Sequence, residues 1–286
     1  MPYVEPTSLA SRSFVVIGAG TLGRRIALMW LTQGGVVHLF DTNATTLDAA
    51  KKYIDGELDG VIERLVPGGK RGTLRTFQER SEALKDAWIV VEAIPEILNA
   101  KINLLGELDK LLPDDCIIAT NSSSYTSSEM FEKVVNRSRL VSTHYYMPPR
   151  SNPVEVMPNP ETDPAVVAVL LREIPKHGLT PFHVRKESVG LIFNRIWAAI
   201  KREALFVVAQ GVAEPSEVDA LMGQVIGGMG VFHQIDEVGL DVALDIEEHY
   251  STVRGQQVPP EPAALLKQYV SQGKLGIKSG EGFYKY

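Results

Sequence analysis

A histidine and a glutamate in the middle of the chain have the residue types and spacing of an acid–base pair. His144 follows a short apolar run, and Glu155 comes eleven positions later on a second apolar segment that could form the neighbouring strand. An imidazole polarised by a carboxylate accepts a proton near neutral pH, which is what is needed to take a hydroxyl proton while hydride leaves the same carbon. Because a single histidine is more often structural, the pair alone leaves its catalytic role open.

A glycine-rich turn near the N-terminus could hold the phosphates of a dinucleotide. The apolar run 14–17 leads into a G-x-G-x-x-G sequence, and a helix-like segment then leads to a second apolar run, 36–40. The residues of the turn are Gly18, Ala19, Gly20, Thr21, Leu22 and Gly23. Its glycines permit a tight turn, a close approach of backbone to a pyrophosphate and close helix–strand packing, and the helix N-terminus favours anions.

An acidic residue after the second apolar run indicates which dinucleotide is bound. Asp41 has the position of the carboxylate that hydrogen-bonds the ribose hydroxyls in such folds. A carboxylate there repels a 2′-phosphate, and residues 42–44 offer no arginine to hold one. The expected cofactor is therefore NAD rather than NADP.

The elements that must place these residues alternate between strands and helices as far as about residue 187. Apolar runs predict strands at 73–77, 87–93, 116–120, 140–143, 154–157 and 179–184, and helical spacing predicts helices at 44–65, 95–112 and 163–176. This alternation predicts an α/β fold with a Rossmann-like, doubly wound and largely parallel sheet, whose ligands collect at the carboxyl ends of the strands. From about residue 190 the pattern becomes wholly helical.

Two domains are therefore expected. Residues 1–187 should form the NAD-binding domain, and residues 188–286 should form an all-helical domain for substrate binding and dimerisation. The predicted helix at 191–210 carries more apolar surface than one layer of following helices could bury. Large apolar interfaces of this kind are typical of obligate dimers, so a homodimer is expected.

Composition excludes several classes of partner. The 286 residues carry a formal net charge of −6 with Lys and Arg scattered along the chain, which argues against nucleic acid. No apolar run approaches the roughly 18 residues that a membrane helix needs. The single Cys116 excludes an internal disulfide, and no His/Cys cluster suggests a metal site. A small-molecule substrate and a cytoplasmic location are expected.

Taken together, the motifs along the chain resemble those of the 3-hydroxyacyl-CoA dehydrogenase family. Besides the glycine turn, the matching segments are 91–96 with Lys101, 121–124, 144–148, 154–156, 190–195, 219–222, 230–236 and 276–286. The order and spacing of these segments carry the resemblance, which extends over almost the whole chain.

The resemblance implies that His144 and Glu155 form a catalytic dyad. It assigns the orientation of the substrate oxygen to Ser123 and Asn194. The NAD contacts that it implies, besides the glycine turn, are Asp41, Glu96, Lys101, Ser123 and Lys278. By their types alone, Asn194 could instead cap a helix and the two lysines could be solvated charges.

Two departures from the family pattern leave it undecided whether the substrate is a coenzyme A thioester. Met147 stands where the family has asparagine, so one hydrogen bond is missing or comes from Tyr145 or Tyr146. The tract 64–72 is short and lacks clear counterparts of the serine and lysine that bind coenzyme A in the family.

The resulting hypothesis is an NAD-dependent oxidoreductase that interconverts a 3-hydroxyacyl group, as a short acyl-CoA thioester, and its 3-keto form. One alternative is a dehydrogenase of a free 3-hydroxy acid, a sugar acid or a carnitine-like substrate. Another is a catalytically silent NAD-binding protein of the crystallin type.

Overall fold

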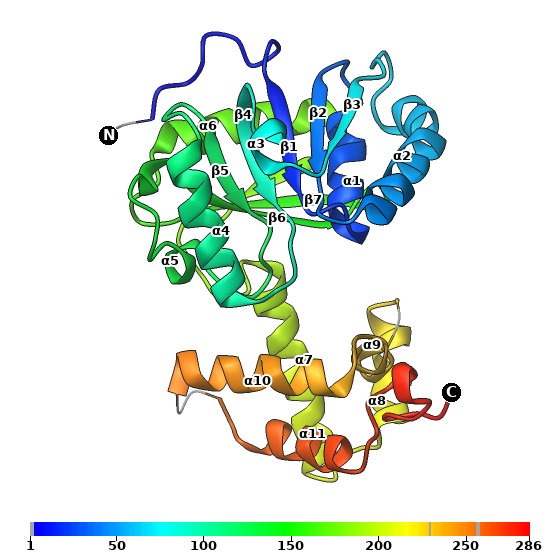
Figure 1. The fold of residues 1–286 in the computed structure, drawn as a ribbon. Coiled ribbons are helices and arrows are strands. Elements are labelled where there is room, and N and C mark those ends of the chain that lie inside the picture. Colours follow the sequence, from blue (N-terminus) through cyan, green and yellow to red (C-terminus); the bar gives the residue numbers. More distant parts are fainter. Residues whose placement is uncertain (1–2, 229, 256–257) are drawn as a thin grey trace. The chain divides into compact units, whose positions relative to one another are not determined.

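Strands and helices alternate in the first part of the chain, and helices alone form the rest, as Figure 1 shows for the computed structural model. The structure describes residues 3–228, 230–255 and 258–286. The chain divides into two units, of which the first ends at Leu191 and the second begins at Ile192.

The first unit is built on one sheet. Its strands are β1 (Ser13–Ile17), β2 (Val36–Phe40), β3 (Thr73–Phe77), β4 (Ala87–Glu92), β5 (Ile117–Thr120), β6 (Leu140–Met147), β7 (Ser151–Pro158) and β8 (Thr180–His183). The described residues form an eight-stranded sheet in the order β3-β2-β1-β4-β5-β6-β7-β8, parallel except for the β6–β7 pair. The predicted doubly wound, largely parallel sheet is confirmed, and its strand order reverses between β1 and β4, where such folds bind ligands.

Helices lie on both faces of this sheet (Figure 1). They are α1 (Thr21–Trp30), α2 (Ala44–Leu65), α3 (Arg80–Ala83), α4 (Leu98–Leu111), α5 (Ser127–Met130) and α6 (Pro164–Glu173), with the 3₁₀ turns η1 (Arg137–Arg139) and η2 (Ile174–His177). The helix predicted at 44–65 has these bounds, and Asn43 caps it by accepting a hydrogen bond from the Thr46 amide. The helix predicted at 95–112 begins later, at Leu98, because Ile97 keeps an extended backbone.

Side chains of the strands point alternately to the two faces of the sheet and contribute to two separate hydrophobic cores. In β1, Phe14 and Val16 face the core that contains side chains of α1, α2 and α6. Val15 and Ile17 face the opposite core, which contains side chains of α3, α4 and α5. Because successive side chains of a strand point to opposite faces, a sheet buried on both sides needs the continuous apolar runs seen in this sequence.

The strand predicted at 140–143 is longer than expected. The prediction that it ends before His144 is wrong, because β6 continues to Met147 by pairing with the antiparallel β7. Aromatic residues at 145 and 146 favour this extension. In the resulting register, His144 lies directly opposite Glu155.

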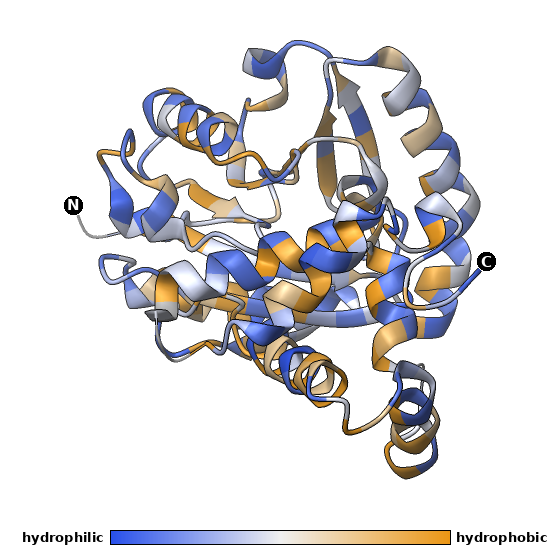
Figure 2. Cartoon of the chain, turned by 90° about the horizontal axis from the view of Figure 1, so that it is seen from below, coloured by the Kyte–Doolittle hydropathy of each residue, from blue (hydrophilic) through white to orange (hydrophobic). Residues whose placement is uncertain are grey.

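The second unit is helical in its described residues. It consists of α7 (Phe193–Ala209), α8 (Pro215–Val225), α9 (Val231–Val238), α10 (Leu240–Arg254), α11 (Glu261–Ser271) and the 3₁₀ turn η4 (Ile277–Ser279). Its core packs side chains such as Leu205, Phe232 and Leu266. In both units, hydrophobic and hydrophilic residues interleave along the helices (Figure 2), and no helix of the described residues has the length and apolar character to cross a membrane.

A buried carboxylate holds the C-terminal motif in this unit. Asp236 is fully buried, and it accepts hydrogen bonds from the amides of Phe283 and Tyr284, each at 2.9 Å. The Tyr286 hydroxyl donates to the same carboxylate at 3.1 Å. The aromatic residues of this motif therefore have a structural role within the second unit.

The packing role of Gly23 can be tested by stability. A Cβ at this position would lie 1.8 Å from the carbonyl oxygen of Gly18, so α1 could no longer approach β1. We expect Gly23→Ala to lower the free energy of unfolding by about 2 kcal/mol or more, measured by urea denaturation.

Gly60→Ala is the matched control, because a Cβ at this exposed position of α2 would meet nothing within 4 Å. The free energy of unfolding of this variant should rise by about 0.5–1 kcal/mol, because alanine has a higher helix propensity than glycine. A Gly23→Ala protein as stable as the wild type would contradict the packing role.

Candidate active site

The glycine turn leaves the N-terminus of α1 open to an anion. Gly20 is the N-cap of α1, which has no side-chain cap and no acidic residue in its first turn. A Cβ at Gly20 would meet nothing within 4 Å, whereas one at Gly18 would lie 2.7 Å from the carbonyl oxygen of Ala93. Free N–H groups beside an unobstructed backbone fit a pyrophosphate, which the dipole of the helix also favours.

The Asp41 carboxylate ties this turn to the end of β2. Its Oδ2 accepts a hydrogen bond from the Ala19 amide at 2.9 Å, and its Oδ1 accepts one from the Asn43 amide at 2.9 Å. Each carboxylate oxygen retains a second lone pair. The position of Asp41 therefore fits an acceptor for ribose hydroxyls.

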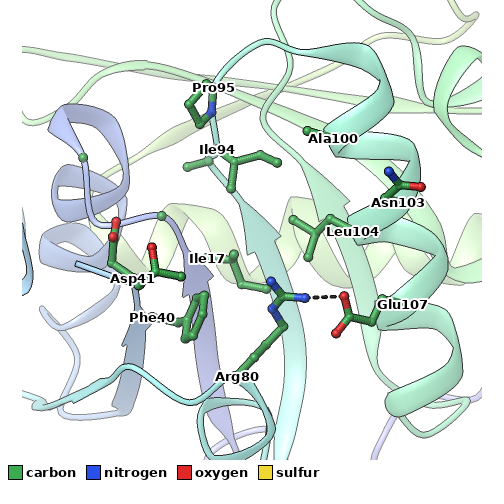
Figure 3. Close-up of a pocket in the computed structure, with 14 residues that line it drawn as sticks. Ile17, Phe40, Asp41, Arg80, Ile94, Pro95, Ala100, Asn103, Leu104 and Glu107 are labelled. Atoms are coloured by element: carbon green, nitrogen blue, oxygen red, sulfur yellow. Dashed lines mark hydrogen bonds and ion pairs between the residues drawn. The ribbon is translucent and has the colours of Figure 1, made fainter. Parts of the chain in front are cut away.

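A cavity of about 650 Å³ opens beside Asp41, between β2 and α4 (Figure 3). Apolar side chains such as Ile94 and Leu104 line it. Arg80 and Glu107 also line it and form an ion pair (Figure 3), and the Arg80 guanidinium lies 5.4 Å from the centre of the Phe40 ring. Arg80 was not identified from the sequence. The signal that could have found it is its position shortly after the end of β3, because ligands of such folds collect at the carboxyl ends of the strands.

A buried ion pair joins the end of β4 to α4. The Lys101 ammonium lies 2.8 and 2.9 Å from the two carboxylate oxygens of Glu92 and 3.2 Å from Glu96. Burial raises the pKa of Glu92, and the adjacent ammonium acts against that increase. Both partners are at most 1% exposed, so Lys101 has a structural role in the first unit, and its contact with NAD stays a prediction.

The serine loop after β5 is held by the same network. The Ser122 hydroxyl donates to Glu96, which also accepts a hydrogen bond from the Ser124 amide at 3.1 Å. The Ser123 side chain is half-buried and has no hydrogen-bond partner among the residues that the structure describes. Ser122, which the resemblance did not single out, therefore anchors the loop and leaves Ser123 available to a ligand.

The structure brings His144 and Glu155 together. The Nδ1 atom of His144 lies 3.3 Å from Oε2 of Glu155, and the two side chains are 7% and 3% exposed. The Tyr146 hydroxyl donates to the same Oε2 at 2.8 Å. The second ring nitrogen of His144, Nε2, has no partner within the described part of the chain, so this geometry suits proton exchange with a ligand.

The two tyrosines proposed to replace the missing asparagine point to opposite faces of β6. Tyr145 is buried in the core, where its hydroxyl accepts a hydrogen bond from Nε1 of Trp30 at 3.0 Å. Tyr145 is therefore wrong as a substitute for the asparagine, because side chains alternate along a strand and only Tyr146 shares the face of His144. Met147 lies at the end of β6 and is 41% exposed.

The remaining predicted residues belong to the second unit. Asn194 is the second residue of α7 and is half-buried. Lys278 lies in η4, where its ammonium is 2.6 Å from Oδ2 of Asp241. Their contacts with substrate and with NAD stay predictions.

Two family models together cover nearly the whole chain. The model described as "3-hydroxyacyl-CoA dehydrogenase, NAD binding domain" matches residues 13–188, and the model described as "3-hydroxyacyl-CoA dehydrogenase, C-terminal domain" matches residues 190–286. The resemblance noted in the sequence motifs is thereby confirmed.

Similar proteins extend this result. The chain is 30% identical over 285 residues to the probable 3-hydroxybutyryl-CoA dehydrogenase of Bacillus subtilis, covering 96% of this chain and 97% of that protein. It is 29% identical over 284 residues to the 5-formyl-3-hydroxy-2-methylpyridine 4-carboxylate 5-dehydrogenase of Mesorhizobium japonicum, covering 96% and 91%.

A solved structure of a 3-hydroxybutyryl-CoA dehydrogenase is also similar to this chain. The crystal structure of the (S)-3-hydroxybutyryl-CoA dehydrogenase of Ralstonia eutropha is similar with a TM-score of 0.84 and 28% identity, over 96% of this chain and 99% of that one. Because the family models match both halves of the chain in order, the protein belongs to the 3-hydroxyacyl-CoA dehydrogenase family and is an NAD-dependent enzyme.

Proposed function

We propose that the protein interconverts the 3-hydroxy and 3-keto forms of a short acyl-CoA thioester, with His144 as the general base and acid. The observation that supports this most is the buried pair of His144 and Glu155, 3.3 Å apart on adjacent strands. In oxidation, Nε2 of His144 takes the proton of the substrate hydroxyl. Glu155 orients the ring and stabilises the imidazolium that forms, and in reduction the imidazolium returns the proton.

The residues that would hold the cofactor are the turn 18–23 for its phosphates and Asp41 for its ribose hydroxyls. When bound there, NAD would accept a hydride from the carbon that bears the substrate hydroxyl. Ser123 donates a hydrogen bond to the substrate oxygen, and the family resemblance implies a second one from Asn194. Both bonds favour the form in which negative charge develops on that oxygen.

A second candidate is the oxidation of a small substrate that carries a carboxylate in place of coenzyme A. The exposed Met147 and the short tract 64–72 favour it, and the Mesorhizobium relative is named for a pyridine carboxylate. Arg150 or Arg185 would then form an ion pair with the carboxylate of the substrate. A silent protein of the crystallin type is disfavoured, because His144 and Glu155 both remain.

A substrate panel distinguishes these candidates. We expect 3-hydroxybutyryl-CoA to exceed free 3-hydroxybutyrate and carnitine in kcat/KM by about tenfold or more when each is assayed with NAD. A free acid that exceeds the thioester would move the assignment to the second candidate.

The cofactor preference is expected to follow from Asp41. NAD should exceed NADP by about tenfold or more in catalytic efficiency, because a 2′-phosphate would lie beside the carboxylate. The double variant Asp41→Ser, Thr42→Arg should narrow the difference. Comparable efficiencies of the wild type with the two cofactors would contradict this assignment.

The dyad is expected to act as one unit. His144→Gln should lower the turnover rate roughly a hundred- to ten-thousand-fold and leave the affinity for NADH nearly unchanged, measured by steady-state kinetics and fluorescence titration. Glu155→Gln should be nearly as damaging, and the double variant should be far less than multiplicatively worse.

The direction of the pH dependence follows from the same roles. Oxidation should rise with pH through an apparent pKa that belongs to the dyad, because it needs neutral His144, and reduction should fall. If His144→Gln kept more than about a tenth of the turnover while chemistry limits the rate, another group would have to carry the proton.

The second unit is expected to form a homodimer. Leu221 and Val225 of α8 and the following Ile226 are 64%, 75% and 71% exposed, which is typical of apolar surface that a partner covers. Sedimentation should give about twice the chain mass of 31.4 kDa at micromolar concentration. Leu221→Glu with Val225→Glu should shift the mass toward the monomer, and a wild-type monomer would refute the proposal.

A further inference from the structure

Tyr146 adds a second donor to the dyad. We propose that Tyr146 is a positioning residue that holds the Glu155 carboxylate in place and weakens its stabilisation of the His144 imidazolium. This inference rests on the proposed function, because His144 is taken as the group that exchanges the proton.

The geometry supports a shared carboxylate oxygen. The Tyr146 hydroxyl is 2.8 Å from Oε2 of Glu155, and Nδ1 of His144 is 3.3 Å from the same atom. An ionised carboxylate only accepts, so the tyrosine must donate, and one oxygen can accept both bonds. The contact from the tyrosine is the shorter, and His144 and Tyr146 therefore share this oxygen of the carboxylate.

The local shape of β6 explains why Tyr146 reaches this atom. Tyr145 pairs with Val154 of β7, but Met147 pairs with Ser151. The register of the two strands therefore shifts at Tyr146. Such irregularities increase the local twist and redirect a side chain. The Tyr146 ring meets the imidazole of His144 edge to face, with centroids 4.7 Å apart, so its ring restrains the histidine while its hydroxyl restrains the glutamate.

The electrostatic consequence has a definite sign. A hydrogen bond donated to Glu155 disperses its negative charge, so the carboxylate stabilises the imidazolium less. Loss of the tyrosine hydroxyl should therefore leave more negative charge on Glu155 and favour the imidazolium, whereas its presence favours the neutral base needed for oxidation. Burial and the neighbouring Glu155 raise the pKa of Tyr146 itself, which keeps its hydroxyl protonated as a donor.

Four charged groups on α1, α5 and α6 have partners of their own among the described residues. Arg25 of α1 donates to the Pro148 carbonyl and the Tyr53 hydroxyl, and Glu129 of α5 accepts from Thr126. The charged residues of α6 pair as Arg172 with Glu173.

On β8, His183 pairs in register with Val156, so Phe182, and not this histidine, is the neighbour of Glu155. Arg150 lies in the turn between β6 and β7, where its amide bonds the Met147 carbonyl. The Tyr146 hydroxyl contacts the dyad directly, through Oε2 of Glu155.

The test is the titration of the His144 imidazole by NMR in the full-length protein, with Tyr146→Phe as the variant. The chain has six histidines, so the His144 signal is assigned by its loss in His144→Gln. Removal of the hydroxyl should raise the His144 pKa by about 0.5 to 1 pH unit. The acidic limb of the pH profile for oxidation should move in the same direction by a similar amount.

Tyr145→Phe is the matched control, because it removes a hydroxyl one residue away whose partner is Trp30. It should lower stability and leave the His144 pKa where it is. In a Glu155→Gln background, Tyr146→Phe should no longer change that pKa, since the tyrosine acts through the carboxylate.

The outcomes separate this inference from the proposed function. The same His144 pKa in the wild type and in Tyr146→Phe overturns the inference, whatever the activity. Full activity of His144→Gln would instead overturn the proposed role of the dyad, while the titration would still report whether the hydroxyl and the imidazole share Glu155. A shift that persists in the Glu155→Gln background would show that Tyr146 does not act through the carboxylate.

Discussion

The antiparallel pairing of β6 with β7 is the constraint on which the candidate active site depends. It sets His144 opposite Glu155, and it directs neighbouring side chains of β6 to opposite faces of the sheet. A slip of one residue would turn the imidazole into the core and bring Tyr145 to the glutamate. The buried bond between Tyr145 and Trp30 opposes such a slip, because each alternative register would leave these polar groups unpaired.

A second constraint lies at the carboxyl ends of β4 and β5. The buried Glu92 and Lys101 would each be costly to bury alone, and their pairing offsets the loss of hydration. Through Glu96 the same ammonium is linked to Ser122, so the serine loop has a fixed shape beside the cofactor turn. This network links the end of β4 and the start of α4 to the serine loop, which lies more distant in sequence, and it gives Ser123 a defined position from which to contact a ligand.

The family assignment and the departures from it concern different parts of the reaction. The glycine turn, Asp41 and the pair of His144 and Glu155 serve the cofactor and the proton, which all members of a dehydrogenase family must handle. Met147 and the tract 64–72 concern the rest of the substrate. Relatives named for a thioester and for a pyridine carboxylate match the chain about equally well, so identity alone does not select the substrate.

The sequence by itself determined the sheet, the helix 44–65, the cofactor turn and the family, because apolar periodicity and glycine spacing are properties of contiguous residues. It also suggested that His144 and Glu155 could meet. Only the tertiary structure decided the extent of β6, the opposite directions of Tyr145 and Tyr146, and the pairing of Arg80 with Glu107 in the lining of the cavity. Each of these features depends on a partner that lies far along the chain. A strand, for example, ends where its hydrogen-bonding partner ends, and no local pattern of residues specifies that point.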